Sequence, residues 1–349
     1  MGALKMKLDI NDLRELTLGA VKVENRRDSF QFYRFNEEEM AYYAPTNHIQ
    51  KSYATAGIEI CALTDAKAVY ILGKLRPGSS RSYYSFDILS DGVLVGEIKN
   101  FSESEMIPDY TEKPFDLGEF SGRVELPDGP KTLRIVFPWS VAVDLYEVEL
   151  VGASYIEKVN TERRMLIYGD SITQGYDAEN PSRSYASRIA RALNANAINK
   201  GIGGEKFAPA LAAIKNDPSP DLITVAYGTN DWVVYDIEKI AKLCEEFYTA
   251  LSKNYPNAKI FALAPIWRGM LTERDAFDSF MRVSKIISAA TEKLDNVIFV
   301  EGIDHVPHDN SYYADLNLHP RNIGFDHYAD NIIDKIKSML GLSHLGRTK

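Results

Sequence analysis

The sequence of 349 residues has few cysteines and no run of apolar residues at its start. Its two cysteines, Cys61 and Cys244, fall in regions with different sequence patterns. A disulfide framework is therefore not expected, and we interpret both as free thiols in a reducing compartment. The amino-terminal segment carries charged residues and lacks the continuous apolar core of a secretion signal, which favours a cytoplasmic location.

Long apolar stretches and an excess of basic residues are also missing. No part of the sequence reaches the roughly 20 apolar residues that a membrane-spanning helix needs, so no membrane partner is expected. The formal net charge is −9. This balance argues against a nucleic-acid partner, because binding to phosphates relies on Lys and Arg.

The first part of the chain is rich in short runs of β-branched and aromatic residues separated by turn sequences. These runs cover residues 56–64, 68–75, 82–98, 120–127, 131–138 and 143–152. Strands at such spacing are typical of a β-sandwich, and we place this domain at residues 1–155. Within it, residues 36–45 are interpreted either as a short helix or as an irregular insertion.

The pattern changes between residues 152 and 163, after which apolar strands alternate with amphipathic helices. We expect strands at residues 164–169, 195–201, 221–228, 259–265 and 296–302, and helices at 183–194, 207–215, 236–254, 273–294 and 321–340. Alternation of this kind predicts a parallel sheet covered on both faces. The sequence therefore predicts a three-layer α/β/α domain with a five-stranded parallel sheet at residues 160–345.

Residues with catalytic chemistry follow four of these strands, and the carboxyl ends of parallel strands are where open α/β sheets place their sites. Ser171 follows the first strand, Gly204 the second, Asn230 the third and His319 the fifth. A serine that cleaves an ester needs a base and preorganised donors for the oxyanion. His319 can be this base, and Pro320 after it fits the first turn of the last helix.

Each of these residues also has a purely structural explanation. Ser171 can be a helix N-cap, Gly204 part of a tight turn, Asn230 a helix cap and His319 an ordinary surface or core histidine. These explanations would have to hold independently of one another. The catalytic interpretation accounts for all four positions at once, and we therefore favour it.

Four ordered blocks carry a resemblance to a known superfamily. They are GDSITQG at residues 169–175, GIGG at 201–204, GTND at 228–231 and LHP at 318–320. In these blocks the chain resembles the SGNH (GDSL-type) hydrolases over roughly residues 164–340. The resemblance implies that Ser171 is the nucleophile, that His319 is the general base, and that Ser171, Gly204 and Asn230 donate to the oxyanion. It implies no cofactor and no metal.

The residues before the histidine depart from the pattern of the superfamily, which usually has Asp three positions earlier. That position is Leu316 here, and Asp315 lies four positions before His319. We expect a one-residue loop adjustment to bring Asp315 to the ring. The alternative is a backbone carbonyl that orients a Ser–His dyad. Other acidic and histidine residues of this loop lack a tight metal-ligand pattern and are interpreted as solvated: Asp304, His305, His308 and Asp309.

The order of the two domains resembles carbohydrate esterase family 2 and related two-domain sugar acetyl esterases, whose front domain is jelly-roll-like. Tyr176, Trp232 and Trp267 are expected to bind substrate as aromatic walls, or else to pack in the core. The resemblance predicts a serine esterase that removes short acyl groups, above all acetyl, from small-molecule or oligosaccharide esters such as acetylated plant-polysaccharide fragments. The alternatives are an SGNH lipase, thioesterase or acyltransferase with a non-sugar substrate, and a carbohydrate-binding pseudoenzyme.

Overall fold

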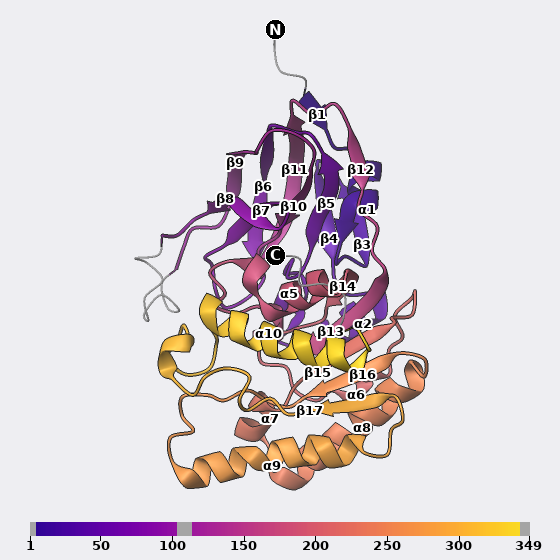
Figure 1. Ribbon diagram of the computed structural model, residues 1–349, viewed down its shortest axis with the longest axis vertical. Helices are drawn as coiled ribbons and strands as arrows, with labels where there is room; N and C mark the ends of the chain where they lie inside the picture. Colours follow the sequence, from indigo (N-terminus) through magenta and orange to yellow (C-terminus); the bar gives the residue numbers. More distant parts are fainter. Residues whose placement is uncertain (1–4, 103–113, 343–349) are drawn as a thin grey trace.

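The computed structural model describes residues 5–102 and 114–342. A β-rich part and an α/β part follow one another along the long axis of the molecule (Figure 1). The architecture changes between β12 (Ile156–Lys158) and β13 (Arg163–Gly169). No helix within residues 5–102 and 114–342 is both long and apolar enough to cross a membrane.

The β-rich part contains two antiparallel sheets that enclose a common core. The first has the order β3-β4-β11-β6-β9 with β1 beside β11, and the second has the order β12-β5-β10-β7-β8 with β2 beside β5. Leu133 and Ile135 of β10 are buried, while the alternating residues Thr132 and Arg134 are partly exposed, as expected for a strand with one face on the core. The antiparallel strands of the predicted sandwich are therefore confirmed.

The strands of this part have the following bounds: β1 (Lys5–Lys7), β2 (Thr17–Leu18), β3 (Lys22–Arg26), β4 (Ser29–Tyr33), β5 (Glu59–Thr64), β6 (Ala68–Pro77), β7 (Ser85–Ser90), β8 (Val93–Lys99), β9 (Glu119–Glu125), β10 (Lys131–Val136) and β11 (Val141–Val151). Its helices are α1 (Ile10–Leu16), α2 (Glu37–Tyr43) and α3 (Ile49–Ser52). The elements between residues 5 and 33 have no counterpart in the sequence prediction. In β3, for example, only Val23 is buried, so the strand shows no alternating pattern.

The α/β part is built on a five-stranded sheet in which every strand pairs in parallel. The order is β14-β13-β15-β16-β17, so the central position belongs to β15 (Leu222–Ala226). The outer members are β14 (Ala195–Asn199), β16 (Lys259–Leu263) and β17 (Val297–Val300). The predicted three-layer domain with its parallel sheet is confirmed.

Helices cover both faces of this sheet. The helices α5 (Tyr185–Ala192) and α10 (Asn322–Met339) share one apolar core with the sheet, while α6 (Pro209–Ala212) and α8 (Ile237–Asn254) share the other. The helix α9 (Arg274–Thr291) packs beside α8. Short helices follow strand ends: α4 (Ser171–Gln174), α7 (Thr229–Val234) and the 3-10 turns Pro181–Arg183 and Asn310–Tyr312.

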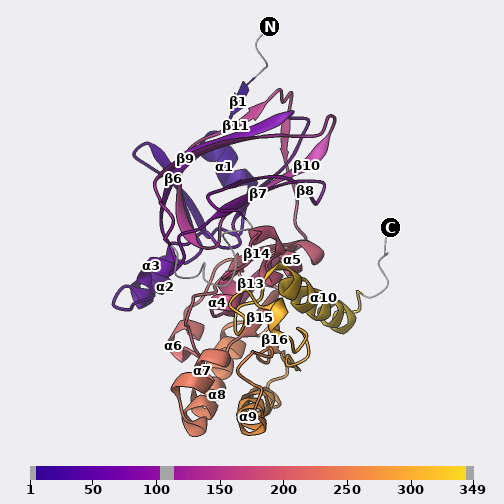
Figure 2. The same cartoon turned by 90° about the vertical axis from the view of Figure 1, so that its left-hand side faces the viewer.

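Residues 34–54 join the two parts. The open question about residues 36–45 is answered by α2, a helix that begins with a capping box between Asn36 and Glu39. Glu39 also forms a fully buried ion pair of 2.6 Å with Lys200, which follows β14. Figure 2 shows α2 and α3 beside the junction, above α6. These contacts tie a segment of the β-rich part to the loop after β14.

Candidate active site

Ser171 lies at the carboxyl end of β13, next to the central strand of the parallel sheet. Asp170 is the N-cap of α4, and its side chain accepts a hydrogen bond of 2.9 Å from the Ile172 backbone N–H. Ser171 is therefore the first residue of α4 and not its cap. A Cβ atom on Gly169 would lie 1.9 Å from the Thr173 Oγ1, so only glycine allows the strand to turn this closely into the helix.

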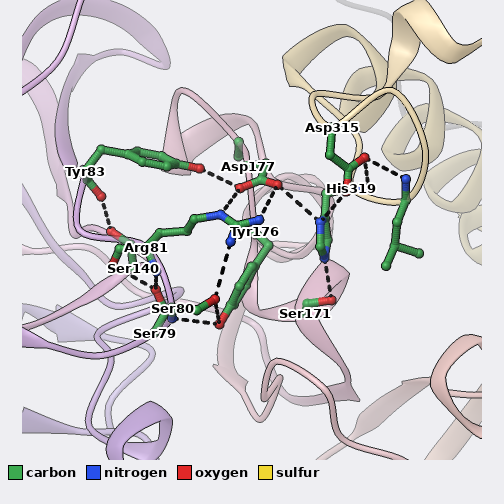
Figure 3. A network of polar contacts seen from close by, with 12 residues as sticks. Ser79, Ser80, Arg81, Tyr83, Ser140, Ser171, Tyr176, Asp177, Asp315 and His319 are labelled. Atoms are coloured by element: carbon green, nitrogen blue, oxygen red, sulfur yellow. Dashed lines mark hydrogen bonds and ion pairs between the residues drawn. The ribbon is translucent and has the colours of Figure 1, made fainter. Parts of the chain in front are cut away.

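The structure brings His319 onto Ser171 from a loop 148 positions further along the chain (Figure 3). The His319 Nε2 lies 2.9 Å from the Ser171 Oγ, a hydrogen-bond distance. The side chain of His319 is only 12% exposed. Pro320 is not in the first turn of the last helix as predicted: Arg321 is the N-cap and Asn322 is the first helical residue, while Pro320 forms an isolated bridge with Tyr313.

Asp315 lies on the other side of the imidazole. Its Oδ2 is 2.9 Å from the His319 Nδ1, while its Oδ1 accepts the backbone N–H groups of residues 317, 318 and 319 at 2.7–3.1 Å. Leu316, in the usual position of the family aspartate, is exposed and has a left-handed backbone with φ of 55°. This turn accommodates the extra residue and allows Asp315 to reach the ring. Both Nδ1 contacts that the structure describes are to carboxylates, which speaks against the alternative of a backbone carbonyl.

A second carboxylate, Asp177, was missed in the sequence analysis. It is fully buried, and its Oδ2 lies 3.2 Å from the same His319 Nδ1 (Figure 3). Arg81 forms an ion pair with it, and the Tyr83 hydroxyl donates a hydrogen bond of 2.6 Å to its Oδ1. Arg81 and Tyr83 belong to the β-rich part, roughly 95 positions away in the sequence. The residues next to Asp177 therefore do not predict its contacts with them.

The two carboxylates control the charge of the imidazole. Burial by itself lowers the pKa of His319, but the negative charge and contact of Asp177, together with the hydrogen bond to Asp315, raise it to about 9. Burial raises the pKa of both carboxyl groups. Their interactions with His319, together with Arg81 for Asp177 and backbone N–H groups for Asp315, outweigh it, so that both pKa values lie below the ordinary value. The site therefore stabilises an imidazolium between two carboxylates.

These three residues also bring donor atoms that a metal ion can use within 4.8 Å of one another. The imidazole, however, contacts both carboxylates through Nδ1 and Ser171 through Nε2. The contacts of the ring thus account for the cluster without an ion.

The predicted oxyanion donors come from three segments: Ser171 begins α4, Gly204 lies in the loop after β14, and Asn230 is in the first turn of α7. Gly203, in the loop after β14, donates its backbone N–H to the Gln174 side chain at 2.9 Å. Gly204 has a left-handed φ of 84°, and neither its backbone N–H nor that of Ser171 has a hydrogen-bond partner in the described part of the chain. The Asn230 side-chain amide donates to the Glu205 carbonyl at 3.0 Å, which anchors Asn230 to the same loop. The backbone N–H groups of Ser171 and Gly204 are thus available to an oxyanion, and the Asn230 amide has a second N–H besides the one donated to Glu205.

The three aromatic residues expected at the site are placed differently from one another. Tyr176 is 4% exposed, and its ring centroid lies 5.4 Å from that of His319. Trp232 is half-buried and donates its indole N–H to the Ser279 hydroxyl. Trp267 is 6% exposed and stacks on His308 at 5.4 Å. Tyr176 therefore borders the imidazole directly, whereas the contacts of the two tryptophans are those of packing.

The expectation that the histidines of the last loop are solvated is wrong for His305, which is 3% exposed. The amino group of Lys335 lies 2.8 Å from its Nε2, and burial lowers the pKa of His305 to about 4. This histidine is neutral and packs under α10. Asp304, His308 and Asp309 are exposed as expected, and the His308 ring stacks on Trp267.

Comparison with known proteins agrees with this geometry. Residues 167–326 match the GDSL-like lipase/acylhydrolase family. The α/β part is an SGNH hydrolase domain. No curated protein sequence matches the chain.

Solved structures share the arrangement of the β-rich part and the SGNH domain. The salicylyl-acyltransferase SsfX3 from a tetracycline biosynthetic pathway is 20% identical, with a TM-score of 0.76 and coverage of 98% of each chain. A family two carbohydrate esterase from Cellvibrio japonicus is 17% identical, with a TM-score of 0.64 over 97% of this chain and 99% of the other. An acetyl xylan esterase from the rumen bacterium Butyrivibrio proteoclasticus is 16% identical, with a TM-score of 0.62 over 98% and 100%. At these identities the likeness shows the fold.

Proposed function

We propose that the protein is a serine esterase that removes short acyl groups, above all acetyl, from carbohydrates. The observation that carries this proposal is the contact between the Ser171 Oγ and the His319 Nε2, in a ring that is held by carboxylates at its other nitrogen. This is the arrangement that activates a serine for attack on an ester.

The proposed reaction has two halves. The Ser171 Oγ attacks the ester carbonyl carbon while His319 takes the hydroxyl proton, and the N–H groups of Ser171, Gly204 and Asn230 bind the resulting oxyanion. When the bond to the sugar oxygen breaks, His319 returns the proton to that oxygen. A water molecule then attacks the acyl-enzyme by the same route, which releases the carboxylic acid and restores Ser171.

A cleft between the two parts of the chain supports a sugar as the alcohol portion of the substrate. It has a volume of about 430 Å³, a size typical of ligand sites. Its lining combines the apolar Phe101 with charged groups that can bind hydroxyls: Glu97, Lys99, Glu179, Arg183 and Arg321. Glu179 lies two positions after Asp177, and Arg321 lies two after His319, so the segments that carry these two residues contribute to the lining of the cleft.

The neighbours in the fold support an acyl ester as the substrate class, and those that are carbohydrate and acetyl xylan esterases favour acetylated sugars. The salicylyl-acyltransferase suggests a second candidate, acyl transfer to an acceptor other than water. In that case the acyl-enzyme would be attacked by an alcohol, with the same roles for Ser171 and His319.

The test varies the length of the acyl chain and the alcohol from which the acyl group is released. We expect the protein to hydrolyse p-nitrophenyl acetate far faster than p-nitrophenyl palmitate, and to release acetate from acetylated xylo- or manno-oligosaccharides. Ser171→Ala serves as the control for adventitious hydrolysis. Faster hydrolysis of p-nitrophenyl palmitate than of p-nitrophenyl acetate would contradict the proposed specificity for short acyl groups. Hydrolysis of p-nitrophenyl acetate without release of acetate from any of the sugars would contradict the carbohydrate substrate.

A further inference from the structure

Asp177 makes more contacts than a residue that only joins two domains would need. Arg81 donates to both of its carboxylate oxygens, at 3.0 and 3.2 Å, and the Tyr83 hydroxyl donates to Oδ1 at 2.6 Å. The remaining direction of Oδ2 faces the His319 Nδ1 at 3.2 Å. Three groups thus surround a carboxylate that is completely shielded from solvent (Figure 3).

The β-rich part also clamps the backbone around Asp177. The Trp139 indole N–H donates to the Ala178 carbonyl at 2.9 Å, and the Ser80 backbone N–H donates to the Tyr176 hydroxyl at 3.3 Å. Asp177 itself has a left-handed φ of 67°, a conformation that costs free energy for a residue other than glycine. The first domain therefore holds this carboxylate in one position from both sides.

Asp315 and Asp177 both contact the imidazole, and each is held in place by a different part of the chain. Asp315 makes the hydrogen bond to Nδ1 and is anchored by backbone N–H groups of its own loop. Asp177 contacts the same nitrogen from the segment after α4 and is anchored by side chains of the β-rich part. Two carboxylates at one ring nitrogen stabilise the positive charge that the imidazole acquires when it takes the proton of Ser171.

We propose that Asp177 is a second positioning carboxylate for His319, set in place by Arg81 and Tyr83, so that the β-rich part completes the catalytic centre of the SGNH domain. The inference rests on the proposed esterase function. In this proposal the first domain helps to stabilise the positive charge of the general base, in addition to any role in binding the sugar.

The charge of the imidazole makes this role measurable. Burial lowers the pKa of His319, and the negative charge of Asp177 is the largest influence that raises it. Besides the two carboxylates, the charged groups near the ring or behind the carboxylates are Asp170, Arg81 and Arg268. Asp170, whose pKa burial raises to about 7, interacts with the charge of the ring and remains in all the variants below.

Asp177→Asn is the decisive variant, because asparagine keeps the size of the side chain and tolerates a left-handed backbone but carries no charge. We expect the midpoint of the acidic limb of the pH profile of kcat/KM to move lower by at least about one pH unit. The plateau of kcat/KM should fall roughly 10- to 100-fold, a smaller loss than in a triad whose only aspartate is replaced. Tyr83→Phe keeps the charge of Asp177 but removes one of the groups that hold it in place, and should shift the midpoint by less. Arg76→Gln breaks a comparable Arg–Asp pair inside the β-rich part and should leave the midpoint unchanged.

A second readout does not depend on turnover. NMR titration of the His319 ring should give a lower pKa in Asp177→Asn than in the wild type, whether or not an ester substrate is found. An inactive wild type with this shift would refute the proposed function and leave the role of Asp177 intact. Unchanged ring titration in a folded Asp177→Asn protein would overturn the inference. If that variant does not fold, the titration of Tyr83→Phe decides in the same way.

Discussion

The raised pKa of His319 predicts a pH-dependent contribution to folding stability. In the folded protein burial lowers this pKa, and the contacts with Asp177 and Asp315 more than compensate and raise it to about 9. In the unfolded chain the ordinary value of about 6.5 applies. The folded state therefore binds a proton more tightly than the unfolded state, and the stabilisation is fully present below about pH 6.5 and lost as the pH rises through about 9.

The difference between the two values corresponds to about 3 kcal/mol, since each pH unit is about 1.36 kcal/mol. His319→Gln removes the titrating group and keeps a polar side chain of similar length. We expect the stability lost in the variant to be about 3 kcal/mol larger at pH 6 than at pH 10.

Urea denaturation of both proteins across this range, followed by circular dichroism, measures the difference. Subtracting the variant from the wild type cancels the titration of groups that do not interact with His319. A stability difference that is constant with pH, or that grows toward alkaline pH, would refute the reasoning about the charge of this imidazole.

Two further variants test the oxyanion loop and the domain junction. Asn230→Ala should lower kcat for a short acyl ester by roughly 10²–10³ with little change in KM, the loss typical of one oxyanion donor, and steady-state kinetics in which KM alone rises would assign Asn230 to substrate binding instead. Glu39→Gln removes the carboxylate partner of the fully buried Lys200, whose pKa burial lowers to about 8, and should cost roughly 3–5 kcal/mol in denaturation experiments. Glu246→Gln in the exposed pair with Lys242 should cost less than about 1 kcal/mol. Equal losses in these two variants would contradict the account of the buried pair.

The sequence was sufficient for the α/β domain because its strands are buried on both faces and its helices have one apolar side. The same reasoning found Ser171 and His319, since both follow predicted strands. It did not find β3, where Val23 alone is buried. A strand exposed along most of its length has no alternation to detect.

The sequence analysis could not predict contacts between distant segments, because the partners lie far apart in the chain. Asp177 has its partners Arg81 and Tyr83 on another domain, and a lone aspartate after a turn is no different in sequence from a solvated one. The reach of Asp315 required the left-handed turn at Leu316, which a residue other than glycine rarely adopts. The burial of His305 depends on Lys335 and on the packing of α10, which the local loop sequence does not encode.

Covalent labelling of the nucleophile tests the central claim most directly. A fluorophosphonate ester reacts with a serine whose proton is taken by a neighbouring base, and mass spectrometry of the digested protein locates the adduct. We predict one adduct, on the peptide that contains Ser171, and the loss of both the adduct and ester hydrolysis in Ser171→Ala. Hydrolysis near the wild-type rate in that variant, or an adduct on another residue, would contradict the account.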